Sequence, residues 1–245
     1  MMLLLDIGNT RLKAALSENN KVEIFSSVSH CGDWVSVIAS LDIPSAVNNV
    51  HIASVVGSSN ESVIAEAVLK KAGVDPVFHQ AASLAAGVRN GYRSPVRLGV
   101  DRWMAIVAAC QRAQGAVCVV DCGTTITIDM VTAKGDHKGG FILPGLAMSK
   151  KSLLQGTKEI KLGAEEHCHK LAWGCSTEEA VCHGALFSSV ASIERAMRDF
   201  KVEEGGVALF LTGGDASVIA KYLHYDELIP ELVLEGILCS ATLNV

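Results

Sequence analysis

The sequence predicts an α/β protein built from two similar halves, and three observations support this fold class. An apolar strand runs into Asp-x-Gly-x-Thr twice, at residues 3–10 and again at residues 118–125. Later in each half a short apolar strand precedes the same helical pattern, Ser-Val-Ile-Ala. No flexible linker or low-complexity segment separates the halves. We therefore expect a duplicated α/β unit, with lobes at residues 1–115 and 116–245 and the ligand between them.

Apolar periodicity and turn residues place the elements of the first half. Strands are expected over residues 2–6, 12–16, 22–27 and 51–56, and helices over 34–41 and 63–72. The second helix starts at Ser59-Asn60-Glu61, because small polar residues favour helix N-termini. A polar segment then leads to a long apolar helix over residues 101–113.

The second half repeats this order. Strands are expected over residues 116–121, 126–132, 139–143 and 207–212, and helices over 145–154, 177–200 and 216–223. The turn Ala133-Lys134-Gly135-Asp136 reverses the chain between the second and third of these strands. Each half therefore reads as strand, loop and meander, followed by helix, strand and helix.

Composition narrows the possible functions. The chain has 245 residues, of which 49% are hydrophobic and 19% charged, so it can bury a substantial core. Its formal net charge of −5, without a Lys/Arg-rich run, argues against electrostatic binding of nucleic acid. Residues 1–5 are too short and lack the basic flank of a secretory signal, and no apolar stretch reaches the length of a membrane span. We expect a cytoplasmic protein without a membrane partner.

The repeated loop has a chemistry suited to phosphate. A carboxylate at the strand end can face a metal ion, and the glycine lets the backbone approach a phosphate closely. The threonine hydroxyl and the N–H groups of the turn can donate to phosphate oxygens. Two such loops that face each other would hold a nucleotide triphosphate from both sides.

Four motifs extend this interpretation to a family resemblance. They are Asp6-Ile7-Gly8-Asn9-Thr10 with Lys13; Tyr92-x-x-Pro95-x-x-Leu98-Gly99-Val100-Asp101-Arg102; Asp121-Cys122-Gly123-Thr124; and Gly139-Gly140-x-Ile142-x-Pro144-Gly145. The chain resembles the superfamily of acetate and sugar kinases, Hsp70 chaperones and actin, and within it the type III pantothenate kinases. The resemblance implies ribonuclease-H-like lobes (the actin-like ATPase fold), with the active site in the cleft between them.

The same resemblance implies an activity and its partners. Type III pantothenate kinases are transferases that phosphorylate the alcohol group of pantothenate with ATP. The product is 4'-phosphopantothenate, and the reaction is the first step of coenzyme A biosynthesis. The resemblance also implies Mg2+ with the nucleotide, a monovalent cation (K+ or NH4+) and a cytoplasmic homodimer.

By resemblance, nucleotide binding falls mainly on the first loop. The ATP-binding residues are Asp6, Ile7, Gly8, Asn9, Thr10, Arg11, Leu12, Lys13 and Thr124. Asp6 would hold magnesium through water, since Mg2+ usually keeps several waters. Lys13 would add positive charge, although it could instead be a solvated strand residue. Asp121 would bind the monovalent cation; alternatively, Asp121 would itself be a second carboxylate on the magnesium side.

The substrate residues transferred by resemblance are Tyr92, Gly99, Val100, Asp101, Arg102 and Thr177. Asp101 would be the catalytic proton acceptor, whereas without the resemblance it reads as a carboxylate favoured by the dipole of its helix. The planar guanidinium of Arg102 suits the carboxylate or amide oxygens of the substrate. Tyr92 is otherwise an ordinary half-buried aromatic residue. Thr177 would contact pantothenate, or cap the helix that it opens.

Two other functions remain compatible with the sequence. One is a non-catalytic regulatory member of the same family, which would keep the fold without turnover. The other is a different kinase of the superfamily, such as a sugar kinase, although the chain lacks the Cys-x-Cys-Gly-x-x-Gly-Cys zinc motif of one large sugar-kinase group. Gly213-Gly214-Asp215 lies where the superfamily packs adenosine, and it also fits an ordinary turn.

Overall fold

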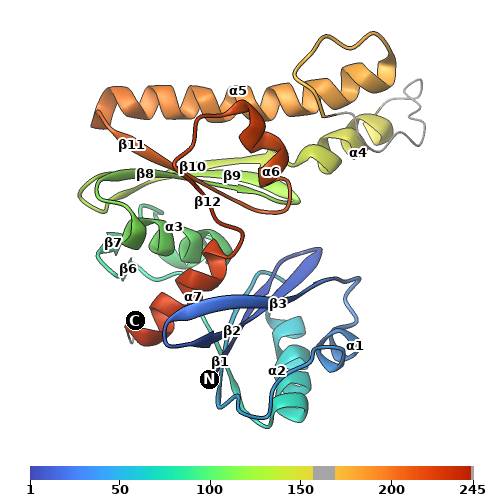
Figure 1. Ribbon diagram of the computed structural model, residues 1–245, viewed down its shortest axis with the longest axis vertical. Helices are drawn as coiled ribbons and strands as arrows, with labels where there is room; N and C mark the ends of the chain where they lie inside the picture. Colours follow the sequence, from blue (N-terminus) through green and yellow to red (C-terminus); the bar gives the residue numbers. More distant parts are fainter. Residues whose placement is uncertain (157–168, 244–245) are drawn as a thin grey trace. The chain divides into compact units, whose positions relative to one another are not determined.

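The computed structural model describes residues 1–156 and 169–243. The chain divides into two compact units, which are described one at a time (Figure 1). Unit 1 comprises Met1–Arg112 and Glu231–Val245, and unit 2 comprises Ala113–Pro230. In the part of the chain that is described, no helix is both long enough and apolar enough to cross a membrane.

Unit 1 contains a five-stranded sheet in the order β3-β2-β1-β4-β5. Its strands are β1 (Met2–Ile7), β2 (Arg11–Glu18), β3 (Lys21–Ser29), β4 (Asn49–Ser54) and β5 (Pro76–Phe78). The first three strands form an antiparallel meander, while β4 and β5 continue the sheet in parallel. This arrangement places the turn after β1 at the carboxyl edge of the parallel strands, where ligands of such sheets usually bind.

One face of this sheet is covered by two helices and holds the main core of the unit. They are α1 (Trp34–Ala39) and α2 (Ser58–Ala72). Alternate residues of the strands, such as Leu5 and Ile52, pack there with Ile64 of α2. Asp6 and Lys13 alternate with these core residues, so they lie on the opposite face of the sheet.

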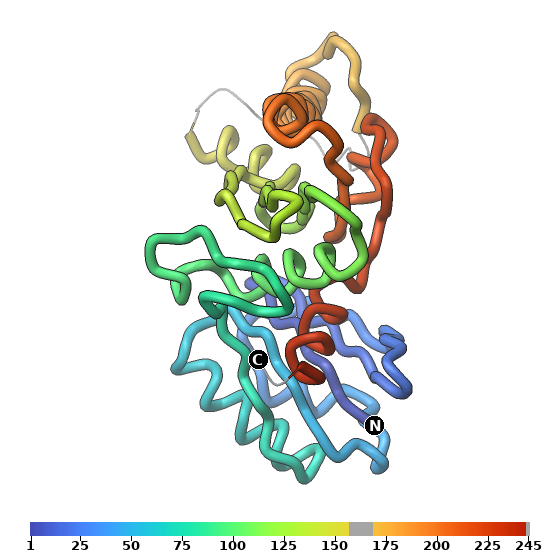
Figure 2. Tube along the Cα trace, turned by 90° about the vertical axis from the view of Figure 1, so that its left-hand side faces the viewer, coloured from blue at the N-terminus to red at the C-terminus, as the bar shows by residue number. Residues whose placement is uncertain are grey.

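The opposite face is contacted by the last helix, α7 (Leu232–Thr242), which packs against β1 and β4. The red C-terminal helix lies beside the blue first strands in Figure 2. It also packs on α3 (Val100–Arg112), and a Cβ at Gly236 would lie 2.0 Å from the carbonyl oxygen of Met104. The sequence analysis did not anticipate α7 and placed this segment in the second half, whereas the structure packs it with the first.

Between β5 and α3 the chain forms short elements that carry the proposed substrate motif. They are the two-stranded ribbon β6 (Leu84–Ala85) with β7 (Val88–Arg89), and the 3-10 helix η1 (Pro95–Arg97). The sequence analysis expected only a polar segment over residues 88–98. The strands β6 and β7 have two residues each, and such short strands show no periodic pattern in the sequence.

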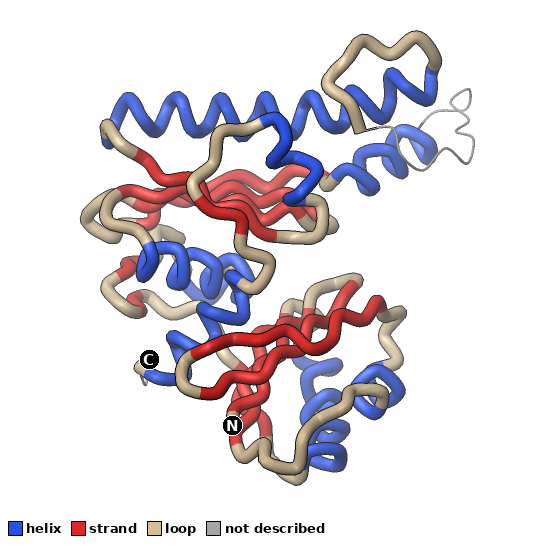
Figure 3. The backbone as a smooth tube through the Cα atoms, in the orientation of Figure 1, coloured by secondary structure: helices blue, strands red, loops and turns tan. Residues whose placement is uncertain are grey.

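Unit 2 repeats the sheet of unit 1 with the order β10-β9-β8-β11-β12. Its strands are β8 (Ala116–Cys122), β9 (Thr125–Val131), β10 (His137–Pro144), β11 (Val207–Thr212) and β12 (Glu227–Leu228). Its helices are α4 (Leu146–Gly156), α5 (Thr177–Glu204), α6 (Ala216–Ile219) and the 3-10 turn η2 (Ala220–Tyr222). In Figure 3, α5 runs along one face of this sheet, where Leu186, Val190 and Ile193 join the core.

The matching strand orders confirm the duplicated α/β unit that the repeat predicted. In both sheets the first strand is central, pairs with the meander on one side and with a later parallel strand on the other. The expected helix over residues 216–223 is divided into α6 and η2. The short edge strands β5 and β12 were not anticipated.

Candidate active site

The first of the two loops predicted to bind phosphate, residues 8–10 (the first phosphate loop), follows β1 in unit 1. Asp6 lies directly opposite Lys13 on β2 and beside Ala53 on β4. Residues directly opposite in an antiparallel pair have Cβ atoms about 5 Å apart and share a face of the sheet. The carboxylate of Asp6 therefore has an ammonium-bearing side chain as its cross-strand neighbour, which places positive charge at the edge of the loop.

The turn itself is closed by backbone contacts. The N–H of Gly8 donates to the carbonyl oxygen of Arg11 at 3.0 Å, and Asn9 and Thr10 at its tip are exposed. Ile7 and Leu12, which flank the turn, are both 0% exposed. Their side chains belong to the core, so only their backbone atoms remain available to a nucleotide.

The proposed substrate motif is organised by Asn90, which the sequence analysis did not single out. Its side-chain amide donates to the carbonyl oxygens of Ala82 at 3.0 Å and Pro95 at 3.3 Å, and its side-chain oxygen accepts from the N–H of Tyr92 at 3.0 Å. Asn90 is only 8% exposed. One buried amide therefore connects three points of this segment through hydrogen bonds. The Asn90-Gly91 dipeptide, which is typical of turns, is the sequence signal that could have indicated it.

Tyr92 and Arg102 form a pair within this motif. Nη1 of Arg102 donates to the Tyr92 hydroxyl at 2.8 Å, and the guanidinium carbon lies 5.6 Å from the ring centroid. Arg102 is 6% exposed. A buried guanidinium costs free energy unless its donors are satisfied, and it has five N–H donors. The hydrogen bond and the ring contact therefore hold the buried guanidinium in one orientation beside Tyr92.

Asp101 lies in the first turn of α3, next to this pair. Its Oδ1 accepts from the N–H of Arg102 at 2.8 Å, which orients the carboxylate. A Cβ at Gly99 would lie 2.5 Å from that Oδ1, so no larger residue fits there without moving the carboxylate. The structure thus brings Tyr92, Gly99, Asp101 and Arg102 together, while Val100 is buried at 7% exposure.

The second loop predicted to bind phosphate, residues 123–124 (the second phosphate loop), follows β8 in unit 2. Asp121 lies opposite Thr127 on β9 and beside Thr212 on β11. Thr212 is 1% exposed, and its Oγ1 makes no hydrogen bond within the described ranges 1–156 and 169–243. Alternation along β8 and β11 places this hydroxyl on the same face as Asp121. Sequence reasoning missed Thr212, because only the pairing of β8 with β11 brings it to the loop.

Two glycines pack closely against the second loop. The N–H of Gly145 donates to the carbonyl oxygen of Thr124 at 3.1 Å, and a Cβ there would lie 2.3 Å from the carbonyl oxygen of Gly123. Gly213, at φ +95°, leaves room for Asp121, since a Cβ would lie 2.4 Å from its Oδ1. Both positions require glycine, which explains two conspicuous glycines of the sequence motifs.

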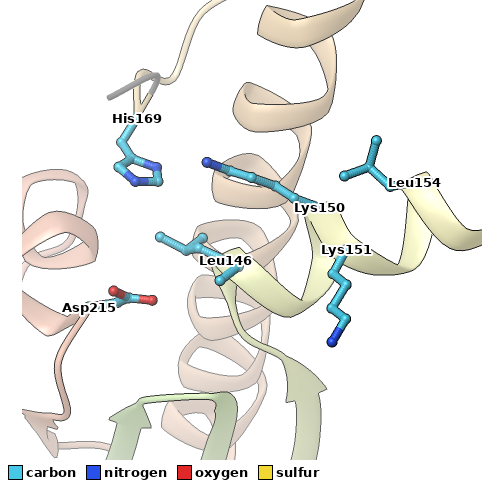
Figure 4. A pocket seen from close by; sticks show the side chains of 7 residues that line it. Leu146, Lys150, Lys151, Leu154, His169 and Asp215 are labelled. Carbon is cyan, nitrogen blue, oxygen red and sulfur yellow. The ribbon is translucent and has the colours of Figure 1, made fainter. Parts of the chain in front are cut away.

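A pocket of about 380 Å³ lies beside this loop within unit 2. Figure 4 shows the Lys150 ammonium and the His169 ring across from the Asp215 carboxylate, with Leu146 between them. The N–H of Asp215 donates to the carbonyl oxygen of Cys122 at 2.8 Å. Burial, followed by the charges of Asp121 and Asp215, raises the pKa of the Cys122 thiol, so this cysteine stays protonated and unreactive.

Thr177 is the first residue of α5 and is exposed. The N-cap is Ser176, whose hydroxyl accepts from the N–H of Glu179 at 3.1 Å, while the Glu179 carboxylate accepts from the N–H of Cys175 at 2.6 Å. The capping alternative for Thr177 is therefore wrong, because Ser176 holds the N-cap position of α5 and its hydroxyl makes the capping contact. Thr177 instead lines a groove of about 460 Å³ between α4 and α5.

The donor set fits the cations that the family resemblance implies. Asp6 and Asp121 supply carboxylate oxygen, the ligand type that hard cations prefer. The buried hydroxyl of Thr212 beside Asp121 is an additional neutral oxygen that lacks a donor partner among the described residues. Neutral oxygens with one carboxylate suit a singly charged ion.

Two similar sheets, each with an Asp-x-Gly loop after its first strand, define the actin-like ATPase fold. Solved structures share it: a Campylobacter jejuni protein assigned to the Baf family of transcriptional activators (TM-score 0.64, 22% identity, 99% of this chain and 98% of that one). Another is the ethanolamine utilization protein EutJ from Carboxydothermus hydrogenoformans (TM-score 0.56, 16% identity, 96% and 88% covered). At these identities the likeness concerns the fold alone.

The family follows from the sequence comparisons. A family model described as type III pantothenate kinase matches residues 2–199. Curated type III pantothenate kinases from Nitrosococcus oceani (37% identity, 97% of this chain and 92% of the relative) and Chromohalobacter salexigens (39% identity, 97% and 86%) are similar over nearly the whole chain. The chain belongs to the type III pantothenate kinase family.

Proposed function

We propose that the protein transfers the γ-phosphoryl group of ATP to the hydroxyl group of pantothenate. The product is 4'-phosphopantothenate, which enters coenzyme A biosynthesis. The observation that carries the proposal is the cluster of Asp101, Arg102 and Tyr92 at the start of α3, where the backbone N–H of Arg102 orients the Asp101 carboxylate and the Tyr92 hydroxyl holds the buried guanidinium. Family membership supports the same activity.

Asp101 is the proton acceptor in this proposal. As the substrate oxygen forms its bond to the γ-phosphorus and the bond to the leaving oxygen of ADP breaks, the hydroxyl proton passes to the Asp101 carboxylate. The contact between Oδ1 and the Arg102 N–H sets the direction of the carboxylate before the substrate binds. Such preorganised proton transfer contributes roughly 10²- to 10⁴-fold to the rate.

Arg102 and Tyr92 bind the substrate in this proposal. Pantothenate carries a carboxylate and amide oxygens, and a guanidinium donates to either group with good geometry. The hydrogen bond to Tyr92 and the burial of Arg102 hold the fork in one orientation. Thr177, exposed at the start of α5, adds a hydroxyl for the same substrate.

The two loops bind the phosphates of the nucleotide. Gly8, Asn9 and Thr10 supply backbone N–H and hydroxyl donors in unit 1, and Thr124 supplies a hydroxyl in unit 2. Asp6 holds the waters of magnesium, and Lys13 adds charge beside it. Magnesium, when bound with ATP, neutralises charge on the phosphates. The pocket beside Asp215 takes the adenosine end of the nucleotide.

Asp121 is the ligand for a monovalent cation, K+ or NH4+. The neighbouring hydroxyl of Thr212 supports this assignment, because it is buried and has no hydrogen-bond partner among the described residues. A cation at this position would satisfy an oxygen that otherwise remains unpaired. We further propose a cytoplasmic homodimer, in keeping with the family resemblance.

The decisive experiment measures ADP formation by the purified protein with Mg2+ and K+, with and without pantothenate. The expected result is pantothenate-dependent ADP formation, with phosphopantothenate identified by mass. Hexoses serve as the control for another kinase specificity. A folded protein that binds nucleotide but shows no dependence on pantothenate would contradict the proposal and favour a regulatory protein.

A further inference from the structure

His30 follows β3 and contacts the first phosphate loop at two points. Its ring atom Nε2 lies 2.9 Å from the carbonyl oxygen of Gly8. Its backbone N–H donates to the carbonyl oxygen of Thr10 at 3.1 Å. A single residue, 22 positions from Gly8 in the sequence, therefore holds both ends of the exposed tip of the loop.

The chemistry of these contacts fixes the tautomer of the imidazole. A carbonyl oxygen only accepts hydrogen bonds, so Nε2 of His30 carries the proton and donates to Gly8. Nδ1 is then the unprotonated nitrogen of the neutral ring, and it has no partner among the described residues. An unpaired acceptor is tolerated more readily than an unpaired buried donor, which agrees with this assignment.

The contact determines the direction of a neighbouring donor. The peptide bond between Gly8 and Asn9 is trans, as are all peptide bonds of the described chain. In a trans peptide the C=O and the following N–H point in opposite directions. Because His30 holds the Gly8 carbonyl toward the protein, the Asn9 N–H points away from His30. Asn9 is exposed and makes no hydrogen bond to another described residue.

The imidazole is itself supported by a chain of contacts in unit 1. The ring packs on Trp34 with centroids 4.2 Å apart. Nε1 of Trp34 donates to Oδ1 of Asn60 at 3.1 Å, and Nδ2 of Asn60 donates to the carbonyl oxygen of Val56 at 2.7 Å. Trp34 is 4% exposed. The imidazole is therefore held by the Trp34 ring of α1, and Trp34 is itself held by its hydrogen bond to Asn60 of α2.

We propose that His30 is a positioning residue for nucleotide binding. Its Nε2–H holds the Gly8 carbonyl so that the Asn9 N–H is aimed outward, ready to donate to a phosphate oxygen of ATP. This inference rests on the proposed function of the loop as a phosphate-binding loop. It concerns the nucleotide and not pantothenate, so the two can be tested separately.

The test compares two substitutions that separate the donor from the ring. His30→Phe keeps an aromatic ring on Trp34 but removes the donor, whereas His30→Gln keeps an N–H donor at a similar distance along the side chain. We expect His30→Phe to raise the KM for ATP and the Kd for Mg-ADP about fivefold, the usual value of one hydrogen bond. His30→Gln should stay within about twofold of the wild type. The KM for pantothenate should not change in either variant.

His79→Phe is the matched control, because His79 is also a part-buried histidine of unit 1, and the ring of His79 hydrogen-bonds the ring of His51 rather than the loop after β1. It should leave the Kd for Mg-ADP unchanged. A direct readout is the amide resonance of Asn9 in an NMR titration with Mg-ADP. This resonance should shift in the wild type and in His30→Gln, and shift much less in His30→Phe.

Equal nucleotide binding by the wild type and His30→Phe, or equal losses in His30→Phe and His30→Gln, would overturn the role of the Nε2 donor. If His30→Phe does not fold, His30→Asn replaces it, since its shorter amide cannot span the 2.9 Å contact made by Nε2. Equal Kd values for His30→Asn and His30→Gln would then overturn the role. Mg-ADP binding needs no turnover, so the test stands even if pantothenate is not the substrate.

Discussion

The two phosphate loops occupy the same place in two sheets of identical strand order, yet their surroundings differ. In unit 1 the loop aspartate, Asp6, faces Lys13 across the strand pair. In unit 2 its counterpart Asp121 faces Thr127 and lies beside Thr212. A carboxylate beside an ammonium group and a carboxylate among hydroxyls suit different ligands. The difference indicates that duplication preserved the scaffold while the neighbouring strands set the chemistry.

The loops are also held in different ways. The first loop has one residue more than the second between its two strands. His30 contacts the carbonyl oxygen of Gly8 in this loop, and the N–H of Val55 donates to the carbonyl oxygen of Ile7, just before the loop, at 3.1 Å. The second loop is packed against the backbone at Gly145 and Gly213. A side-chain anchor can be altered by substitution without moving backbone, whereas a glycine contact cannot.

The largest expected effect is on turnover, and it tests whether Asp101 of unit 1 is the proton acceptor. Asp101→Asn should lower kcat by at least about 100-fold, because the amide cannot accept the proton. Nucleotide binding should persist, since the Asn oxygen can still accept from the Arg102 N–H and support the helix start. Coupled measurement of ADP formation and calorimetry with Mg-ADP would check both. Asp33→Asn, at the start of α1, is a control of the same chemistry. Wild-type turnover in Asp101→Asn would remove it from the mechanism.

The second prediction separates the two loop aspartates. Asp6→Asn should raise the Mg2+ concentration needed for half-maximal rate about tenfold, while Asp121→Asn should raise the K+ requirement by a similar factor, as expected for groups that hold a metal. Rates measured over a matrix of both cations would show this crossing pattern. Sodium should not replace potassium in the wild type. If both variants changed the same cation requirement, the contrast between the loops would be contradicted.

The third prediction concerns the substrate side. Arg102→Lys should raise the KM for pantothenate about tenfold, because lysine lacks the planar fork and the contact to Tyr92. Tyr92→Phe should cost only about fivefold, the value of one hydrogen bond. A double-mutant cycle measures their coupling. Additive effects of the two substitutions would show that the pair does not act as a unit.

The smallest expected effect concerns acid stability and contrasts the histidines of the two units. In unit 2, His137 pairs with the buried Asp129 at 2.9 Å. In unit 1, burial, followed by the neighbouring His51, lowers the pKa of His79 from 6.5 to about 4. Below pH 6.5 His79 binds a proton in the unfolded chain, whereas in the folded chain it does so only below about pH 4. The folded state therefore loses stability relative to the unfolded state as the pH falls from 6.5 to about 4.

Replacing His79 by Phe should therefore reduce the loss of stability between pH 6.5 and pH 4. Urea unfolding midpoints of the wild type and His79→Phe at several pH values would measure the difference. The titrating groups that do not contact His79 are common to both proteins and cancel in the comparison, whereas a change at its partner His51 is part of the measured difference. Parallel curves for the two proteins would contradict the assignment to His79.

Much of this protein is determined by the sequence itself. The repeated apolar strand and Asp-x-Gly turn established the duplication, because strand ends and turns depend on residues close together in the chain. The motif around Asp101 and Arg102 identified the family for the same reason. The need for glycine at position 99 is also set locally, because a Cβ there would meet Asp101, only two residues along the chain.

Only the tertiary structure decided how the neighbours of these motifs are arranged. It brought His30 to Gly8, Thr212 to Asp121, and α7 to α3, although these partners lie far apart in the sequence. Strand pairing and helix packing create such contacts, and a single residue such as histidine or threonine carries no periodic signal that announces them. The sequence therefore determines where the two Asp-x-Gly loops lie along the chain, while long-range packing determines how each loop is aimed.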